Sequence, residues 1–147
     1  MKRFLVTGGC GFIGSNFLHF FLKQHSDISV VNLDKLTYAG IRANTKDLEK
    51  DSRYQFVHGD ICDTDLVRKL TKETECVIHF ASETHVDRSI GSGQDFVVTN
   101  VVGTNVLLEA ARESKIDRFL HFSTDEVYGS RSKGSFSEVD PLNPSSP

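Results

Sequence analysis

Short apolar runs alternate along the chain with longer segments in which apolar residues recur at helical spacing. The runs have the length and composition of buried strands, and they lie at 4–6, 28–34, 53–57, 76–80 and 118–122. The longer segments predict helices, and they span 13–24, 63–72 and 95–114. Because strands alternate with helices of crossover length, the pattern predicts an α/β fold with a doubly wound, mostly parallel sheet of about five strands.

The remaining segments are predicted from their polar and turn-forming residues. Residues 41–50 are polar enough for a short surface helix or an irregular loop, and the Gly, Ser and Pro residues of 130–147 predict a loop. Helix 95–114 is apolar on more than one face, so it is expected to pack on the sheet and also against a second surface. Aromatic residues of the first helix are expected in the core: Phe12, Phe17, Phe20 and Phe21. Three histidines are expected to be hydrogen-bonded core or sheet residues rather than catalytic ones: His79, His85 and His121.

A glycine-rich turn joins the first predicted strand to the first helix. Gly8, Gly11 and Gly14 stand at G-x-x-G-x-x-G spacing. Gly8 allows a tight turn, Gly11 lets the backbone approach a phosphate, and Gly14 permits close contact of helix and strand. A dinucleotide pyrophosphate is held in this way at a helix N-terminus, although similar turns also occur as plain hairpin or linker loops.

A carboxylate at the end of the second strand strengthens the nucleotide interpretation. Asp34 follows Gly14 by 20 positions, where this kind of fold places the ribose 2′-hydroxyl of the cofactor. A carboxylate there accepts a hydrogen bond from that hydroxyl and repels a 2′-phosphate, so it favours NAD over NADP. The alternative is a solvated acid at a strand end. Together the turn and the acid predict a Rossmann-type NAD-binding domain over 1–129.

Charge and cysteine content exclude several other classes. The net charge is −3, and the 17 Lys and Arg are scattered among 20 Asp and Glu, so a nucleic acid is not expected as a partner. The three cysteines have no C-x-x-C spacing, so neither a metal site nor a disulfide set is expected. The N-terminus lacks a secretory apolar segment, and no apolar run approaches the length of about 18 residues that spans a bilayer. A cytoplasmic protein without a membrane partner is therefore expected.

Five sequence motifs resemble the extended short-chain dehydrogenase/reductases and, among them, the 4,6-dehydratases of dTDP-glucose. They are the glycine turn at 6–14 and the stretches Asp-Lys-Leu-Thr-Tyr-Ala-Gly at 34–40, Gly-Asp-Ile-Cys-Asp at 59–63, His-Val-Asp-Arg-Ser at 85–89 and Ser-Thr-Asp-Glu-Val-Tyr-Gly at 123–129. The resemblance implies NAD-dependent dehydration of a nucleotide-bound glucose, such as dTDP-glucose, to the 4-keto-6-deoxy sugar. It also implies a nucleotide-sugar as substrate and, in the full-length form, a homodimer that packs through helix 95–114.

The same resemblance implies a role for individual residues. Thr124 would hydrogen-bond the C4 oxygen of the sugar, Asp125 would protonate the leaving C6 hydroxyl, and Glu126 would take the C5 proton. Two adjacent carboxyl groups can supply such an acid and a base, although adjacent acids are often ordinary loop residues. Thr84, together with Thr124, would contact the substrate. The residues implied for NAD are Gly8, Gly11, Phe12, Ile13, Gly14, Asp34, Lys35, Leu36, Thr37, Asp60, Ile61, Phe80, Ala81, Ser82 and Thr99.

The resemblance further implies parts that the sequence does not contain. Related sequences have a Tyr-x-x-x-Lys motif directly after a Ser-Pro like Ser146-Pro147, and its tyrosine is the base for the C4 hydroxyl. The last strands of the sheet and a smaller nucleotide-sugar domain follow it, so the resemblance implies a doubly wound Rossmann-type sheet that is truncated after about five strands. The loop 130–147 is therefore expected to lead to that absent helix, and these 147 residues alone are expected to lack turnover. Two alternatives stay open: a nucleotide-sugar 4-epimerase of the same fold, and a non-catalytic NAD-binding module.

Overall fold

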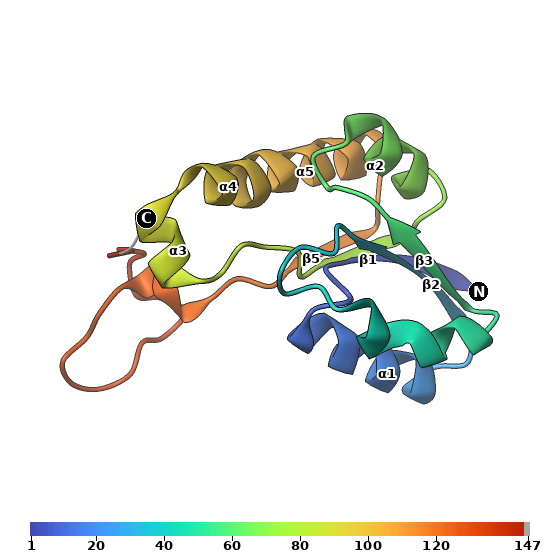
Figure 1. Ribbon diagram of the computed structural model, residues 1–147, viewed down its shortest axis with the longest axis horizontal. Helices are drawn as coiled ribbons and strands as arrows, with labels where there is room; N and C mark the ends of the chain where they lie inside the picture. The colour runs from blue at the N-terminus through green and yellow to red at the C-terminus, as the bar shows by residue number, and fades with distance from the viewer. Residues whose placement is uncertain (146–147) are drawn as a thin grey trace.

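The computed structural model describes residues 1–145 and confirms the predicted α/β fold. Ser146 and Pro147, the expected approach to a further helix, lie outside the described residues. Five parallel strands form one sheet in the order β3-β2-β1-β4-β5 (Figure 1). Their bounds are β1 Lys2–Thr7, β2 Ile28–Asp34, β3 Tyr54–His58, β4 Cys76–His79 and β5 Arg118–His121. Each strand coincides with a predicted run, apart from small shifts at its ends.

Helices cover both faces of the sheet, as a doubly wound topology requires (Figure 1). One face carries α1, Phe12–Gln24, and the 3-10 helix η1, Arg42–Lys50. The other face carries α2, Thr64–Thr71, and a continuous helical segment composed of α4 Gln94–Phe96, the π-helix η2 Val97–Gly103 and α5 Thr104–Glu113. Two short helices follow the carboxyl ends of β4 and β5, namely α3 Val86–Gly91 and the 3-10 helix η3 Asp125–Tyr128.

Two hydrophobic clusters hold these layers together, one on each face of the sheet. One cluster joins the central strands to α2 and α5 and contains Leu33, Val67 and Leu107. The other joins the sheet to α1 and contains Val6 and Leu18. All five of these side chains are fully buried. Because the central strands are covered on both sides, both faces of each strand are apolar, which explains the continuous apolar runs in the sequence.

Local contacts explain where the shorter helices begin. The backbone N–H of Leu66 donates to Oδ1 of Asp63 at 3.0 Å, so Asp63 caps α2. Segment 41–50 forms a helix rather than an irregular loop. Its first residue, Arg42, places its guanidinium 3.7 Å from the centroid of the Phe56 ring on β3. This stacking fixes the start of η1 against the edge strand of the sheet.

The long helical segment at 94–113 confirms the predicted helix at 95–114 and adds a π-helical middle. Gly103 lies in that middle, and a Cβ there would stand 2.6 Å from the side chain of Ile61. The glycine therefore allows the helix to approach the loop after β3. The opposite face is exposed at Val97, Val101 and Leu108. Nothing in the described part of the chain covers this second apolar face, so the surface expected against it is not supplied by residues 1–145.

Two of the four phenylalanines expected in the core are exposed. Phe17 and Phe21 stack with ring centroids 4.9 Å apart and pack against the cluster beneath α1. Phe12 and Phe20, however, are 82% and 61% exposed. The prediction was wrong for these two because the buried face of α1 is a single stripe, and Phe12 stands at the outer edge of the first turn. Phe12 therefore lies on the surface beside the glycine turn.

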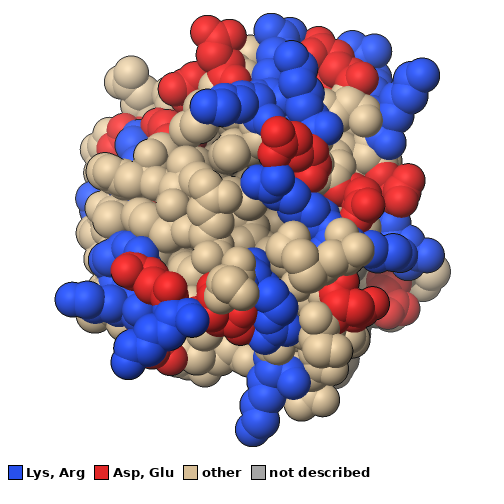
Figure 2. Space-filling model, turned by 90° about the vertical axis from the view of Figure 1, so that its right-hand side faces the viewer, with Lys and Arg blue, Asp and Glu red and all other residues tan. Residues whose placement is uncertain are grey.

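The surface carries both signs of charge. In the face shown in Figure 2, Lys and Arg residues are interspersed with Asp and Glu rather than gathered in one positive patch. Over residues 1–145, no helix has the length and apolar content needed to cross a bilayer. Cys10, Cys62 and Cys76 are all free thiols. After β5 the chain continues as a loop that projects away from the sheet (Figure 1).

Candidate functional site

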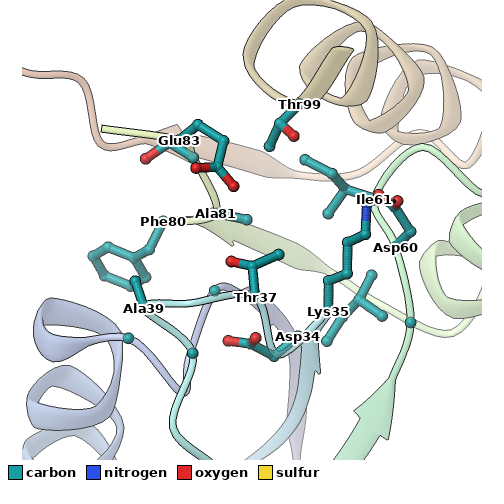
Figure 3. A pocket seen from close by; sticks show the side chains of 16 residues that line it. Asp34, Lys35, Thr37, Ala39, Asp60, Ile61, Phe80, Ala81, Glu83 and Thr99 are labelled. Carbon is teal, nitrogen blue, oxygen red and sulfur yellow. Dashed lines mark ion pairs between the residues drawn. The ribbon is translucent and has the colours of Figure 1, made fainter. Parts of the chain in front are cut away.

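The predicted site residues gather at the carboxyl ends of the parallel strands, around two adjoining pockets. The first pocket, shown in Figure 3, lies over β1 and β2 and has a volume of about 100 Å³. The second lies over β4 and β5 and measures about 570 Å³. Residues 81–83 line both pockets. A long ligand could therefore occupy the first pocket and reach the second along this shared wall.

The glycine turn forms one end of the first pocket. Gly8 has a φ of +72°, and a Cβ there would stand 2.6 Å from the backbone nitrogen of Ala81. A Cβ on Gly14 would stand 2.3 Å from the carbonyl oxygen of Gly8, so this glycine lets the helix approach the turn itself. Gly11 is more open, with the Gly8 oxygen 3.3 Å from the corresponding position. The three glycines thus keep the turn tight on its inner side and accessible on its outer side.

Hydrogen bonds within the turn determine which of its amides can meet a ligand. The N–H of Gly9 donates to Oδ1 of Asn32 at 3.1 Å, and that of Cys10 donates to Oδ2 of Asp34 at 2.8 Å. The N–H of Gly11 donates to the carbonyl of Gly8 at 3.2 Å, whereas in residues 1–145 the amides of Phe12 and Ile13, in the first turn of α1, have no acceptor. Unpaired N–H groups at a helix N-terminus form an anion site, strengthened by the helix dipole. This is the arrangement that a pyrophosphate requires.

Asn32 is a site residue that the sequence analysis missed. It is fully buried in β2, and besides accepting from Gly9 it donates from Nδ2 to the hydroxyl of Tyr54 at 2.9 Å. A signal was present, because a buried strand asparagine must be hydrogen-bonded and strand alternation places it on the same side as Asp34. Asn32 and Asp34 together support the turn from the neighbouring strand.

Asp34 lies at the turn, as the predicted convergence of acid and glycines requires. One carboxylate oxygen accepts from Cys10, and the other accepts from the N–H of Leu36 at 2.8 Å. Leu36 has a φ of +55°, and the chain then folds back so closely that a Cβ on Gly40 would stand 2.6 Å from Oδ1 of Asp34. The carboxylate therefore orders the loop at 35–40 and still has lone pairs for a ribose hydroxyl.

The opposite rim of the first pocket is an ion pair. Nζ of Lys35 lies 2.7 Å from Oδ2 of Asp60, and the two side chains point toward each other in Figure 3. Burial alone would raise the pKa of Asp60, but the N–H of Cys62 and the ammonium of Lys35 outweigh it and hold that pKa below its usual range. Asp60 in turn raises the pKa of Lys35. Both groups are charged at neutral pH, and they close the rim between the ends of β2 and β3.

Most residues predicted to contact the cofactor line this pocket, and some lie beside it. The predicted residues in the lining are Gly8, Gly11, Asp34, Lys35, Thr37, Asp60, Ile61, Phe80, Ala81, Ser82 and Thr99. The predicted residues outside it are Phe12, Ile13, Gly14 and Leu36, which belong to the adjoining turn and loop. The lining also contains residues that were not predicted: Leu33, Ala39, Gly40, Gly59 and Glu83.

The second pocket contains all the residues predicted to act on a substrate. Thr124, Asp125 and Glu126 follow β5 and open the short helix η3, while Thr84 approaches from the loop after β4. The three residues of the trio are exposed at the mouth of the pocket. Since these residues come from segments about 40 positions apart, only the parallel pairing of β4 with β5 brings them together. A hydroxyl and two carboxyl groups here can provide hydrogen bonding, acid and base to one ligand.

A buried histidine lies beneath both pockets. Thr7 Oγ1 and His79 Nδ1 are 2.7 Å apart, and His79 Nε2 lies 3.0 Å from Thr104 Oγ1. Burial, with a smaller contribution from the nearby ring of His121, lowers the pKa of His79 to about 4. The ring is therefore neutral at pH 7. Because the N–H of Ala81 donates to Thr7 at 3.4 Å, we assign the Thr7 hydroxyl as donor to Nδ1 and the ring hydrogen to Nε2.

This histidine should make folding stability fall in mild acid. The unfolded chain binds a proton at this ring near pH 6.5, whereas the folded chain binds it only near pH 4. Lowering the pH through that window favours unfolding, by up to about 3 kcal/mol from this group. Urea unfolding at pH 7 and pH 4.5 gives the free energy of unfolding of the wild type and of His79→Asn. The loss of this free energy between pH 7 and pH 4.5 should be smaller in the variant. The same substitution at His85, an exposed histidine before α3, is the matched control, and a His79 variant with an unchanged pH effect would contradict the assignment.

The described residues contain no group of three or more His, Cys, Asp or Glu side chains placed to hold a metal ion. The polar groups that this site presents are the backbone amides of the glycine turn, the Lys35–Asp60 ion pair at the rim and the Thr-Asp-Glu trio. These features match the donors expected for a dinucleotide and for a polar ligand beside it.

Comparisons with known proteins agree with this geometry. The sequence model of the GDP-mannose 4,6 dehydratase family matches residues 5–147. The low-salt glycan biosynthesis protein Agl12 of Haloferax volcanii is 54% identical over 143 residues, which are 97% of this chain and 46% of that protein. The crystal structure of DesIV, a dTDP-glucose 4,6-dehydratase of Streptomyces venezuelae solved with NAD bound, superposes with a TM-score of 0.94 at 48% identity. The superposition includes 99% of this chain and 46% of the DesIV chain.

Epimerases of sugar nucleotides share the fold. The UDP-glucuronic acid 4-epimerase of Bacillus cereus, solved with UDP-glucuronic acid and NAD, gives a TM-score of 0.89 at 38% identity, with 99% of this chain covering 47% of the epimerase. The chain thus spans slightly less than half the length of the relatives it matches. Because the family model covers nearly every residue, the chain belongs to the GDP-mannose 4,6 dehydratase family.

Proposed function

We propose that this chain is the NAD-binding half of a dTDP-glucose 4,6-dehydratase. The observation that carries the proposal is the pair of adjoining pockets with a shared wall at 81–83. One pocket has the glycine turn and Asp34, and the other has the Thr-Asp-Glu trio. The likeness to DesIV supports the same assignment.

The residues present fit NAD at the first pocket. The free amides of Phe12 and Ile13 would hold the pyrophosphate, and Asp34 would accept from the adenosine ribose, disfavouring a 2′-phosphate. Lys35 and Asp60 would close the adenosine side. When bound there, NAD would accept the hydride that leaves C4 of the sugar and give it back at C6, so that the cofactor would end unchanged.

The trio would then act on the sugar in the second pocket. Thr124 hydrogen-bonds the C4 oxygen and fixes the ring in place. Glu126 removes the proton from C5, which is acidic beside a C4 ketone, and Asp125 protonates the hydroxyl that leaves C6. One water molecule is lost, with Glu126 as the base and Asp125 as the acid of two proton transfers at neighbouring carbons.

The test begins with the coding sequence downstream of Pro147. If a Tyr-x-x-x-Lys motif follows, the protein that includes it should convert dTDP-glucose to a product lighter by one water, whereas residues 1–147 alone should give none. Glu126→Gln in the longer protein should abolish exchange of the C5 proton in deuterated water. Mass spectrometry and proton NMR read both results. Turnover by residues 1–147 alone, or unimpaired exchange in the variant, would contradict the proposal.

The same assay distinguishes the alternatives. A nucleotide-sugar 4-epimerase would change the configuration of a sugar nucleotide without changing its mass, and the match to epimerase structures keeps this candidate open. Adjacent Asp125 and Glu126 favour the dehydratase, because epimerisation at C4 removes no proton from C5. A non-catalytic NAD-binding module would bind NAD and turn over neither substrate.

The exposed apolar face of 97–108 supports a homodimer in the full-length form. Val101 is 62% exposed at the centre of that face, and exposed apolar patches of this kind mark association surfaces. Sedimentation velocity should show that the chain self-associates and that Val101→Asp reduces this self-association. The same substitution at Val139, exposed in the loop after β5, serves as the control. A stable monomer at high wild-type concentration would contradict the expectation.

We further propose a cytoplasmic setting and a nucleotide-sugar as the partner molecule. The three free thiols are consistent with a reducing compartment. In the face shown in Figure 2, Lys and Arg alternate with Asp and Glu and form no continuous basic patch of the kind that binds a nucleic acid.

A further inference from the structure

Two side chains hold the wall shared by the two pockets: Thr7 at Ala81, described above, and Asn100 at Glu83. After β4, the N–H of Phe80 still pairs with the carbonyl of Thr7 at 3.0 Å, but the following residues belong to no strand or helix until α3. In this segment Glu83 makes two backbone hydrogen bonds to the amide of Asn100. Its N–H donates to Asn100 Oδ1 at 2.8 Å, and its carbonyl accepts from Asn100 Nδ2 at 2.8 Å.

The geometry resembles one rung of a β-ladder in which a side-chain amide replaces a strand. Both polar ends of the Asn100 amide are used, so the side chain cannot turn without breaking two bonds. Each bond is short, and Glu83 and Asn100 are half-buried. A two-point contact of this kind fixes both the position and the orientation of the peptide groups at Glu83.

The helix that presents Asn100 is π-helical over 97–103. Thr99 lines the first pocket and Asn100 lines the second, so consecutive residues of this helix face different pockets. Figure 3 shows Thr99 reaching from the helix toward the first pocket, with Glu83 and Ala81 on the segment beneath it. Single π-turns inside helices occur often at functional sites, where they redirect side chains.

We propose that Asn100 is a positioning residue that sets the path of a dinucleotide from the first pocket to the second. This inference rests on the proposed function, because it takes NAD as the ligand. The adenosine half lies over Asp34 and Asp60, so the nicotinamide half must pass along 81–83 to reach the trio. Asn100 holds that stretch of chain at Glu83, its C-terminal end. Loss of the clamp should therefore weaken contacts to the nicotinamide half and leave the adenosine half unaffected.

The experiment uses calorimetry to measure the affinity of the 147-residue chain for two ligands. They are NAD and ADP-ribose, which lacks the nicotinamide ring. Asn100→Ala should lower the affinity for NAD about tenfold and that for ADP-ribose less than twofold. Hydrogen exchange followed by NMR should show the Glu83 amide exchanging at least tenfold faster in the variant. Asn105→Ala, an exposed asparagine on the next turn of the same helix, is the matched control and should change none of these values.

Each other outcome counts against a specific statement. Equal NAD affinity in wild type and Asn100→Ala would overturn the positioning role, and so would an equal loss for both ligands, since that would indicate general damage to the fold. Failure of the wild type to bind either ligand would overturn the proposed function on which this inference rests. The exchange measurement needs no ligand. If the Glu83 amide exchanged equally fast in the wild type and in Asn100→Ala, the two hydrogen bonds between Glu83 and Asn100 would not form in solution.

Discussion

Gly8→Ala is expected to abolish measurable NAD binding and to lower the free energy of unfolding by about 3 kcal/mol. Gly8 has a φ of +72°, which an L-residue adopts only at a cost of about 1–2 kcal/mol. A Cβ would also stand 2.6 Å from the nitrogen and 2.7 Å from the Cα of Ala81. Both atoms belong to the backbone, so the clash can be relieved only if the turn and the end of β4 separate.

That separation would damage the site as well as the fold. The turn carries the amides of Phe12 and Ile13, and Ala81 begins the wall shared by the two pockets. Urea unfolding measures the loss of stability, and calorimetry measures NAD binding. Gly91→Ala is the control, because nothing lies within 4 Å of a Cβ there and helix α3 favours alanine. A Gly8 variant as stable and as active in binding as the Gly91 variant would contradict the role of the turn.

Asp34→Ala should lower NAD affinity at least a hundredfold and destabilise the fold by about 3 kcal/mol, because two hydrogen bonds to a charged group are lost. The amides of Cys10 and Leu36 would lose their acceptors, so the glycine turn and the loop at 35–40 would both be released. The ribose would lose its acceptor at the same time. Because the repulsion of a 2′-phosphate also disappears, NADP should lose much less affinity than NAD.

Asp27→Ala gives the control for Asp34, since Asp27 is an exposed acid in the turn before β2. Calorimetry with NAD and NADP on both variants provides the ratio of affinities, and urea unfolding provides the stabilities. If Asp34→Ala kept the wild-type ratio of NAD to NADP affinity, the carboxylate would have no part in cofactor choice. Its structural role would then rest on the unfolding data alone.

Sequence patterns were sufficient to predict the strands and helices that form the layers of the molecule. The strands were predictable because buried strands of a parallel sheet are apolar on both faces, and α2 because apolar residues recur at helical spacing over 63–72. The pairing of the glycine turn with Asp34 followed from spacing, since both lie at carboxyl ends of neighbouring strands. The residues that a hexose would meet were predicted by resemblance. The pattern failed at Phe20, where an apolar residue lies on the solvent side of α1.

The sequence by itself determined the α/β class, the order of elements and the turn that presents free amides, because each depends on residues close together in the chain. Only the tertiary structure decided that Asn32 supports Gly9, that His79 links Thr7 to Thr104, and that Asn100 clamps Glu83. These contacts join residues 17 to 72 positions apart. The spacing of residues in the sequence does not predict the hydrogen-bond partner of a side-chain amide or imidazole. The two groups come close only when the sheet and its covering helices pack.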